Sequence, residues 1–365
     1  FSGEWKEEQL DSIATLSKGI GISKEQLSED GEPCILYGEL YTKYKSEIIK
    51  QVESKTDING SKLKRSKAND VIIPCSGETA VDIATARCVP FDNILLGGDL
   101  NVISLHKYDG AFMSYQLNGK RKYDIARVAQ GVSIVHLYGE HLKAIKTYNP
   151  TLPEQQKIAK LLSLLDDRID TQNKIIEDLK KLKSAISERL FKSVKGFTVL
   201  LSDLCDIVKG KQINGENLSD SGNYYVMNGG TEPSGYYDNY NVEASTISIS
   251  EGGNSCGYVQ FNTSPFWSGG HCYSIQNIAD KVDNMYLYHY LKSNEDAIMK
   301  LRIGSGLPNI QKKDLAMFKI IVPKIEWQIK ISTFLSSLER KAEIEERIQN
   351  VMQKQKLYLL QQMFI

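Results

Sequence analysis

Residues 150–169 of this chain read PTLPEQQKIAKLLSLLDDRI, and residues 323–342 read PKIEWQIKISTFLSSLERKA. These stretches open a repeat in which residues 150–191 align with residues 323–364 without a gap, at a constant offset of 173. Identical pairs recur along its length: Pro150/Pro323, Gln155/Gln328, Ile158/Ile331, Leu162/Leu335, Leu165/Leu338, Ile175/Ile348, Lys183/Lys356 and Phe191/Phe364. An internal repeat of this kind predicts two copies of one structural unit.

Both copies of the repeat have the pattern of a long helix. Each has proline near its start, where the missing amide hydrogen is harmless, and neither glycine nor proline follows Pro153 in the first copy or Pro323 in the second. Apolar residues recur at alternating steps of four and three, as in a coiled coil. This seam becomes polar at the same two places in both copies, Gln172/Glu345 and Lys183/Lys356. The shared register favours two helices packed against each other, and we expect them to run antiparallel.

The segments before the helices, residues 1–149 and 196–322, are mixed and strand-rich. Short β-branched or aromatic runs alternate in them with clusters of glycine, asparagine and serine. Their openings match at an offset of 191: Ile13/Leu204, Leu16/Ile207, Lys18/Lys209 and Gly19/Gly210. We therefore expect two tandem halves, with domains at residues 1–149 and 196–322 and long helices at residues 150–195 and 323–365. The fold class is α+β, in which an antiparallel coiled-coil pair separates two strand-rich domains about a pseudo-two-fold axis.

The composition is that of an ordinary globular protein. The 365 residues include 45 Lys+Arg and 45 Asp+Glu, which excludes a uniformly basic nucleic-acid coat and a polyanionic disordered chain. No apolar run reaches the ~18 residues of a membrane span, and no leader pattern precedes a cleavage site. The sequence begins at Phe1 instead of methionine, which is consistent with missing N-terminal residues.

The six cysteines are scattered and form no CxxC pair. This spacing is typical of reduced thiols in a cytoplasmic protein and not of a disulfide framework or a zinc site. The cysteines are Cys34, Cys75, Cys88, Cys205, Cys256 and Cys272.

Sequence signatures of catalysis are missing. The chain has no G-x-x-x-x-G-K-[ST], HExxH or G-x-S-x-G motif. No set of candidate catalytic residues accompanies the glycine turns at residues 75–77 and 229–231, so we interpret these turns as loop tips. The five histidines (His106, His136, His141, His271 and His289) are too dispersed for a metal cluster. We expect neither a catalytic residue nor a metal ligand.

The start of the first helix, Leu152-Pro-Glu-Gln-Gln-Lys-Ile-Ala-Lys-Leu-Leu-Ser-Leu-Leu-Asp166, resembles the specificity subunits of type I restriction–modification systems. Its occurrence once in each half strengthens the resemblance, which covers essentially the whole chain. The second copy departs from the pattern, because Trp327 stands where the first copy has Glu154.

The resemblance implies a sequence-specific, non-catalytic DNA-binding subunit. Each domain would be a target-recognition domain that reads one half of a bipartite site in double-stranded DNA. The helices would space the domains and dock the methyltransferase (modification) subunits, beside restriction/translocase subunits. This chain would bind no cofactor, since S-adenosylmethionine, ATP and Mg belong to those partners. A helix over residues 154–191 would be roughly 57 Å long at ~1.5 Å per residue, and half-sites one DNA turn apart are separated by roughly 34–36 Å.

Candidate DNA contacts in the first domain are its clusters of cations. Phosphate contacts need local positive charge, which net charge does not report. Three cations follow the Asn118-Gly119 turn, and we expect them at a hairpin tip that enters a groove. The candidates are Tyr41, Lys43, Lys45, Lys64, Arg65, Lys120, Arg121 and Lys122.

The second domain has few cations, but ten tyrosines and many Gly, Asn and Ser residues. Loops of this composition approach base edges and donate hydrogen bonds to bases and phosphates. The candidates are Lys209, Lys211, Gln212, Asn228, Thr231, Ser234, Tyr236, Asn254, Ser268, His271 and Ser305.

One alternative function stays open, a non-catalytic protein-interaction scaffold with a coiled-coil stalk. The recognition half of a fused restriction enzyme is disfavoured, because the chain has no room for a catalytic domain. The sequence does not give the DNA target or its gap length.

Overall fold

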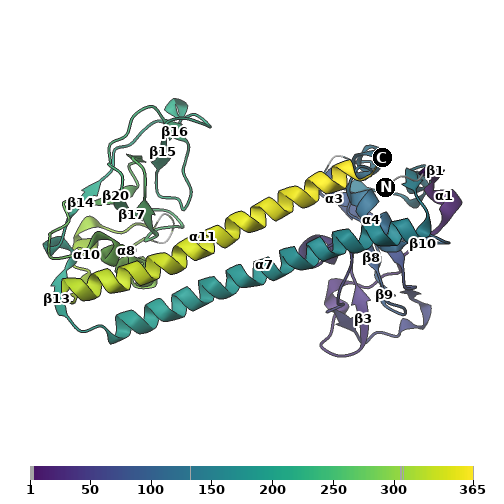
Figure 1. Ribbon diagram of the computed structural model, residues 1–365, viewed down its shortest axis with the longest axis horizontal. Coiled ribbons are helices and arrows are strands. Elements are labelled where there is room, and N and C mark those ends of the chain that lie inside the picture. Colours follow the sequence, from purple (N-terminus) through teal and green to yellow (C-terminus); the bar gives the residue numbers. More distant parts are fainter. Residues whose placement is uncertain (1–3, 132, 305, 307, 365) are drawn as a thin grey trace. The chain divides into compact units, whose positions relative to one another are not determined.

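The computed structural model describes residues 4–131, 133–304, 306 and 308–364, which form two compact units (Figure 1). Unit 1 comprises residues 1–174 and 347–365, and unit 2 comprises residues 175–346. Each unit therefore contains part of both long helices, α7 (Leu152–Ser193) and α11 (Ile325–Gln362). The two long helices predicted from the repeat are confirmed.

Side-chain contacts show that α7 and α11 pack antiparallel within each unit. In unit 1, Lys356 pairs with Asp166 at 2.6 Å, and Gln349 hydrogen-bonds Asn173. In unit 2, Lys180 Nζ lies 2.6 Å from Glu346 Oε1, and Lys183 Nζ lies 2.5 Å from Glu339 Oε1. The partner number falls along α11 as the residue number rises along α7. The expected antiparallel pairing is thus confirmed inside both units.

The main sheet of unit 1 has the antiparallel strand order β2-β10-β6-β8. These strands are β2 (Ala14–Lys18), β10 (Leu100–Leu105), β6 (Asp70–Pro74) and β8 (Arg87–Val89). A second sheet has the order β4-β3-β9-β5, with β3 and β9 parallel. Its strands are β3 (Glu32–Ile35), β4 (Lys55–Thr56), β5 (Lys64–Arg65) and β9 (Leu95–Leu96). Further pairs are β1 (Lys6–Gln9) with β12 (Lys146–Asn149), and β7 (Ser76–Gly77) with β11 (Val135–His136).

Unit 2 repeats this plan although the two sequences have diverged. Its main sheet has the antiparallel order β14-β20-β17-β18, and β15 runs parallel to β19 in the order β16-β15-β19. The strands are β14 (Asp206–Lys209), β15 (Tyr224–Met227), β16 (Tyr236–Tyr237), β17 (Thr246–Ser250), β18 (Val259–Asn262), β19 (Trp267–Ser268) and β20 (Cys272–Gln276), with β13 (Phe197–Leu200) paired to β21 (Lys319–Val322). The matching strand orders support the α+β fold with two related halves.

Short helices complete the units. Those of unit 1 are α1 (Leu10–Ile13), α2 (Glu39–Thr42), α3 (Ala80–Ile83), α4 (Gly110–Asn118), α5 (Lys122–Val128) and α6 (Gly139–Lys143), with 3-10 turns η1 (Lys24–Gln26) and η2 (Gly60–Lys62). Those of unit 2 are α8 (Asn284–Ser293), α9 (Glu295–Met299) and α10 (Lys312–Ala316), with η3 (Leu201–Asp203) and η4 (Gly215–Asn217).

A repeated glutamine joins each domain to the helix that follows it. In unit 1, Gln155 donates to Pro150 O at 2.8 Å and accepts from Asp109 N at 2.9 Å. Asp109 is the N-cap of α4, so the start of α7 and the start of α4 are held together. The equivalent Gln328 donates to Pro323 O at 2.9 Å and accepts at 2.8 Å from the N-cap of α8, Asp283. This explains why the repeat preserves a glutamine there.

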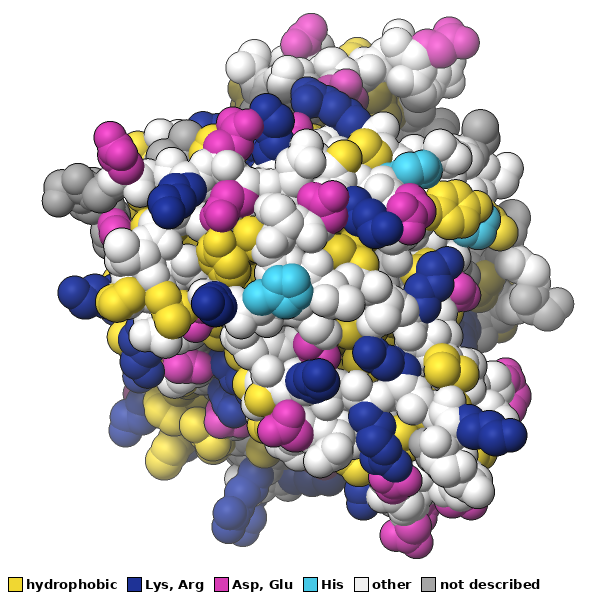
Figure 2. All heavy atoms as spheres, turned by 90° about the vertical axis from the view of Figure 1, so that its right-hand side faces the viewer, with side chains coloured by type: hydrophobic (Ala, Val, Ile, Leu, Met, Phe, Trp, Pro, Cys, Tyr) yellow, Lys and Arg dark blue, Asp and Glu magenta, His cyan; other side chains and the backbone are white. Residues whose placement is uncertain are grey.

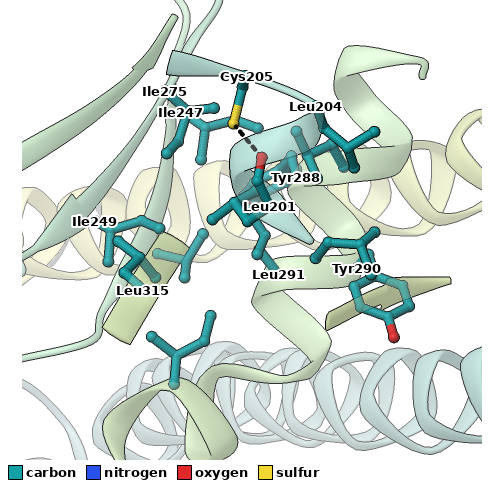
Figure 3. Packing of buried hydrophobic residues seen from close by; sticks show 14 of the residues in the cluster. Leu201, Leu204, Cys205, Ile247, Ile249, Ile275, Tyr288, Tyr290, Leu291 and Leu315 are labelled. Carbon is teal, nitrogen blue, oxygen red and sulfur yellow. Dashed lines mark hydrogen bonds between the residues drawn. The ribbon is translucent and has the colours of Figure 1, made fainter. Parts of the chain in front are cut away.

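Buried side chains from both long helices contribute to the cores. Phe364 packs on Phe112 of α4 in unit 1, with ring centroids 5.4 Å apart, and the equivalent Phe191 packs on Tyr286 of α8 in unit 2 at 5.8 Å. Figure 3 shows the apolar core of unit 2, where Leu201 and Leu204 meet side chains of the sheet and of α8. All six cysteines are free and buried.

Candidate nucleic-acid interface

Many of the candidate DNA contacts lie at one end of the strands in the main sheet of unit 2. β14 ends there at Lys209, β17 ends at Ser250 and β20 begins at Cys272, which pairs with Ser250. The glycine edge, as we call it, comprises residues 209–212, 250–254 and 268–272. The opposite end of the sheet is covered, because Asn284 of α8 donates to Ser245 O at 2.7 Å. The glycine edge is therefore the end of this sheet that faces away from α8.

Glycines at this edge are required by close backbone packing. A Cβ atom on Gly210 would lie 2.2 Å from Gly269 O, and one on Gly269 would lie 2.6 Å from Asn228 Oδ1. Gly253 has a φ of +79°, which favours glycine. The loops are thus held close together without bulky side chains, which leaves backbone groups within reach of a ligand.

Hydrogen bonds connect the segments of the glycine edge to one another and to Asn228, which follows β15. Asn228 Oδ1 accepts from His271 N at 3.1 Å, and Lys209 Nζ donates to Glu251 Oε1 at 2.6 Å. Lys211 N donates to Ser268 O at 2.8 Å, which fixes the loop after β14. The structure brings these candidates together, with most of their side chains exposed: Lys209, Lys211, Gln212, Asn228, Asn254 and His271.

Three other candidates of the second domain lie outside the glycine edge, and Ser268, which lies within it, does not expose its side chain. Thr231 and Ser234 are exposed in the β15–β16 loop, and Tyr236 is half-buried in β16. Ser268 is fully buried, and its hydroxyl donates to Cys272 O at 3.3 Å, so its side chain faces the interior. Ser305 lies outside the described residues.

The first cluster of unit 1 surrounds α2. Tyr41 donates to Ser76 O at 3.1 Å, and burial raises the pKa of its hydroxyl. Lys43 forms an ion pair with Glu39 at 2.8 Å, and Lys45 donates to Tyr41 O at 2.9 Å. These candidates are adjacent, but each already has a partner within the domain.

The second cluster lies on β5. Arg65 binds both carboxylate oxygens of Glu32, at 2.6 and 3.0 Å, and the side chain of its neighbour Lys64 is half-buried. A phosphate would compete with Glu32 for the Arg65 guanidinium, because that group recognises both ligands in the same bidentate way.

The expected hairpin at Asn118-Gly119 is wrong. Asn118 ends α4, and Lys122 begins α5, so the three cations lie in a helix–helix turn. The N-cap Asp109 and the buried run of α4 favour helix over strand here. Lys120 is exposed, whereas burial and the nearby Arg87 lower the pKa of Lys122.

Sequence reasoning did not include Lys18 among the candidates. Lys18 ends β2 and pairs with Asn101 of β10, as Lys209 ends β14 and pairs with Tyr273 of β20. It is exposed, and its ammonium lies 5.7 Å from the centre of the Tyr138 ring. The offset of 191 that matches Lys18 with Lys209 was the signal that could have identified it.

Buried charges lie where the helices meet the domain of unit 1. Lys356 Nζ lies 2.5 Å from Glu47 Oε2 and 2.6 Å from Asp166 Oδ1. Burial and the charge of Glu47 raise the pKa of the Asp166 carboxyl, although Lys356 opposes that shift. Burial opposes the charge on Lys356, but the two carboxylates raise its pKa overall. This cluster holds α11 to α7 and to the domain.

Both long helices expose apolar side chains in addition to their packed seam. In unit 1 these are Leu152, Leu161, Leu164, Ile348, Val351, Leu357 and Tyr358, and in unit 2 they are Ile175, Leu182, Ile325, Trp327, Ile329, Phe334 and Ile344. Leu161 and Phe334 are equivalent in the repeat, as are Ile175 and Ile348. Extended apolar surface on a helix is typical of a protein-docking site. Over the described residues, no helix is both long and apolar enough to cross a membrane.

Comparisons with known proteins agree with this arrangement. The family model for the type I restriction modification DNA specificity domain matches residues 2–181 and again residues 196–354. A Mycoplasma genitalium protein named as a type I specificity subunit is 34% identical over 122 residues, which cover 33% of this chain and 31% of that protein. The type I restriction enzyme MjaVIII specificity subunit of Methanocaldococcus jannaschii is 24% identical over 329 residues, covering 79% and 76% of the two chains.

A solved structure has the same fold. The crystal structure of a type I restriction-modification S subunit from M. genitalium superposes with a TM-score of 0.70 at 20% identity, covering 100% of this chain and 97% of that one. The first relative above is matched over less than a third of its own length, so sequence similarity to it is confined to that part.

Proposed function

Because the chain belongs to the specificity subunits of type I restriction–modification systems, a family of non-catalytic components, we propose that it recognises a bipartite sequence in double-stranded DNA. The target-recognition domains at residues 1–149 and 196–322 each read one half of the site. The helical segments at residues 150–195 and 323–365 set the spacing and dock methyltransferase subunits. The observation that carries the proposal is the equal strand order of the main sheets. The first strand of each sheet, β2 or β14, ends at an exposed lysine that is followed by glycine.

The balance of positive and negative charge on the chain is consistent with a DNA-recognition subunit that binds DNA together with other subunits. Figure 2 shows Lys and Arg interspersed with Asp and Glu over the face drawn, and the whole chain has equal numbers of both signs. A protein that holds DNA alone gains most of its affinity from phosphate contacts. We therefore propose that the partner subunits supply much of the backbone contact, while this chain supplies base contacts.

The exposed apolar side chains of α7 and α11 support a docking role. Two of these positions recur in both copies of the repeat, Leu161/Phe334 and Ile175/Ile348, and each unit exposes apolar helical surface that could bind one methyltransferase subunit. S-adenosylmethionine, ATP and Mg chemistry would then lie in the methyltransferase and the restriction/translocase subunits, since this sequence lacks the corresponding motifs. The free, buried cysteines fit a reducing, cytoplasmic compartment.

Three measurements test the proposal. Methylation mapping in cells that express this chain with its cognate methyltransferase should give one bipartite motif. A band-shift with that DNA should require, or be strongly enhanced by, the methyltransferase. Domain assignment follows from a chimera in which residues 196–322 come from a relative, because only one half of the motif should change. Absence of any methylated motif, or a change in both halves, would contradict the proposal.

A further inference from the structure

Glu251 is a buried carboxylate at the exposed glycine edge of unit 2. Its side chain is 9% exposed. Oε1 accepts from Lys209 Nζ at 2.6 Å and from the Tyr273 hydroxyl at 3.1 Å. Oε2 accepts no hydrogen bond from any residue that the structure describes. The Nδ1 atom of the exposed His271 lies 3.9 Å from Oε2, beyond hydrogen-bonding distance.

A buried carboxylate oxygen without a donor is unfavourable, and such groups are rare in folded proteins. A carboxylate only accepts hydrogen bonds, so the missing partner must be a donor. His271 lies within 4 Å of Oε2, and 62% of its side chain is exposed. Movement of this exposed side chain is the step that would have to admit a ligand to Oε2.

The available donors on DNA are few. Phosphate groups offer acceptors and a negative charge, so they do not fit beside Glu251. In the major groove, the hydrogen-bond donors are the exocyclic amino groups of cytosine (N4) and adenine (N6), and Glu is a known type of acceptor for the former. Oε2 can therefore accept a hydrogen bond from the edge of a base but not from the DNA backbone.

The equivalent position of unit 1 carries no carboxylate. Cys75 follows β6 and donates from its backbone N to Asp99 O at 2.7 Å, as Glu251 follows β17 and donates to His271 O at 2.8 Å. No ion pair of Lys18 is found in the part of the chain that the structure describes. The described part of unit 1 therefore lacks the lysine–carboxylate pair that Lys209 and Glu251 form in unit 2.

We infer that Glu251 is a specificity-determining residue of the second domain, whose Oε2 accepts a hydrogen bond from the exocyclic amino group of a cytosine or adenine. This inference rests on the proposed DNA-reading function. It makes Lys209 and Tyr273 positioning residues, because they fix Oε1 and leave Oε2 for the base. Glu251 then determines one base position in the half-site of the second domain.

The test compares Glu251→Gln with the wild-type chain, each in complex with the methyltransferase subunit. Sequences bound from a randomised DNA library give the preference at every base position. Glu251→Gln keeps the size of the side chain but replaces one oxygen with a donor, so the preference for an amino-bearing base should fall by roughly 5- to 150-fold at one position. The first half-site should stay unchanged. The control Glu243→Gln removes the same charge from an exposed side chain of the same domain and should alter no position.

Thermal unfolding of each variant separates reading from folding. Should Glu251→Gln unfold, Glu251→Asp withdraws the acceptor by one methylene and should weaken the preference at that same position. The inference is overturned by a uniform loss of affinity for all DNA in a folded variant, or by an unchanged motif. If the wild-type complex selects no motif at all, the proposed function itself fails.

Discussion

Lys183 of α7 and Lys356 of α11 occupy equivalent positions of the repeat and form equivalent ion pairs. Lys183 Nζ lies 2.5 Å from Glu339 Oε1 in unit 2, and Lys356 Nζ lies 2.6 Å from Asp166 Oδ1 in unit 1. Asp166 and Glu339 are themselves equivalent. A polar pair inside an apolar seam is satisfied in only one register, so these pairs favour the observed helix alignment within each unit.

A tyrosine from the adjoining domain joins each ion pair. Tyr115 of α4 donates to Asp166 Oδ2 at 2.7 Å, and Tyr288 of α8 donates to Glu339 Oε1 at 3.1 Å. The helix pair and the domain are therefore connected through one polar cluster in each unit, which is largely buried in unit 1 and half-buried in unit 2.

Replacing Lys356 with methionine should strongly destabilise unit 1. The change leaves the carboxylates of Glu47 and Asp166 buried without a cation, which typically costs about 3–5 kcal/mol. Denaturant unfolding measures the loss in free energy of unfolding. The control Lys192→Met removes an exposed ion pair with Glu188 and should change stability little. Equal effects of the two substitutions would show that the buried cluster does not stabilise the fold.

Acid should weaken unit 2 through His289. Burial lowers the pKa of this histidine to about 4. The charge of Lys183 acts in the same direction, whereas the carboxylates of Glu339 and Asp283 oppose the shift. A histidine in the unfolded chain titrates near 6.5, at ~1.4 kcal/mol per unit of pKa difference. Stability is therefore full above that pH and falls by up to roughly 3 kcal/mol as the pH drops towards 4.

The variant His289→Gln isolates this effect. Glutamine still reaches Ser336, which His289 contacts at 2.9 Å, but it does not titrate. The free energy of unfolding, measured from pH 7 to pH 4, should fall less steeply in the variant than in the wild type. Parallel curves would assign the acid sensitivity to other groups.

The long helices were predictable because their information is local. Heptad spacing, the proline starts and the shared polar positions all lie within each copy of the repeat. The sheets were not predictable in the same way, since β2 pairs with a strand more than eighty residues away. At Asn118-Gly119 the turn residues were recognised, but their signal does not tell whether strands or helices flank the turn.

The candidate site was predictable only in part, for a similar reason. Lys209 and His271 carry the signals of exposed polar loops, and the structure places them together. Glu251 carries no such signal, because a glutamate in sequence reads as a surface charge. Glu251 is held in its buried position by Lys209, which precedes it by 42 residues, and by Tyr273 of β20. Such buried polar groups can be identified only when the pairing of the strands is known.

Replacing Lys211 with alanine should weaken binding to all DNA sequences. Its exposed ammonium lies at the glycine edge, where a phosphate contact releases counterions. The affinity should fall in parallel for cognate and non-cognate DNA, and the slope of log affinity against log salt should decrease by about one. The control Lys281→Ala changes an exposed lysine beyond the opposite end of β20. An unaltered salt slope for Lys211→Ala would place that side chain outside the interface.

A chain that ends after the first helix, residues 1–195, should form a homodimer. Without α11, unit 1 loses the packing of Phe364 on Phe112, while Phe191 at the end of α7 loses its site on Tyr286. Phe191 is equivalent to Phe364, so α7 of one copy can replace α11 in another. Analytical ultracentrifugation should give twice the mass of the fragment, and Phe191→Ala should shift the equilibrium towards monomer. A monomeric, folded fragment would contradict the exchange.

Lengthening both long helices should lengthen the gap between the half-sites of the proposed DNA target. An insertion in α7 alone would break the shared register, because ion pairs at Lys183 and Lys356 hold the helices together on either side of its centre. Inserting one heptad after Asn173 and another after the equivalent Glu346 preserves the apolar seam. Seven residues add roughly 10 Å at ~1.5 Å each, which corresponds to about three base pairs at ~3.4 Å each. Methylation mapping should then show unchanged half-sites with a longer gap. The single insertion serves as the control and should lose activity, because its two ion pairs demand different registers. An unchanged gap in a fully active double insertion would restrict the helices to docking.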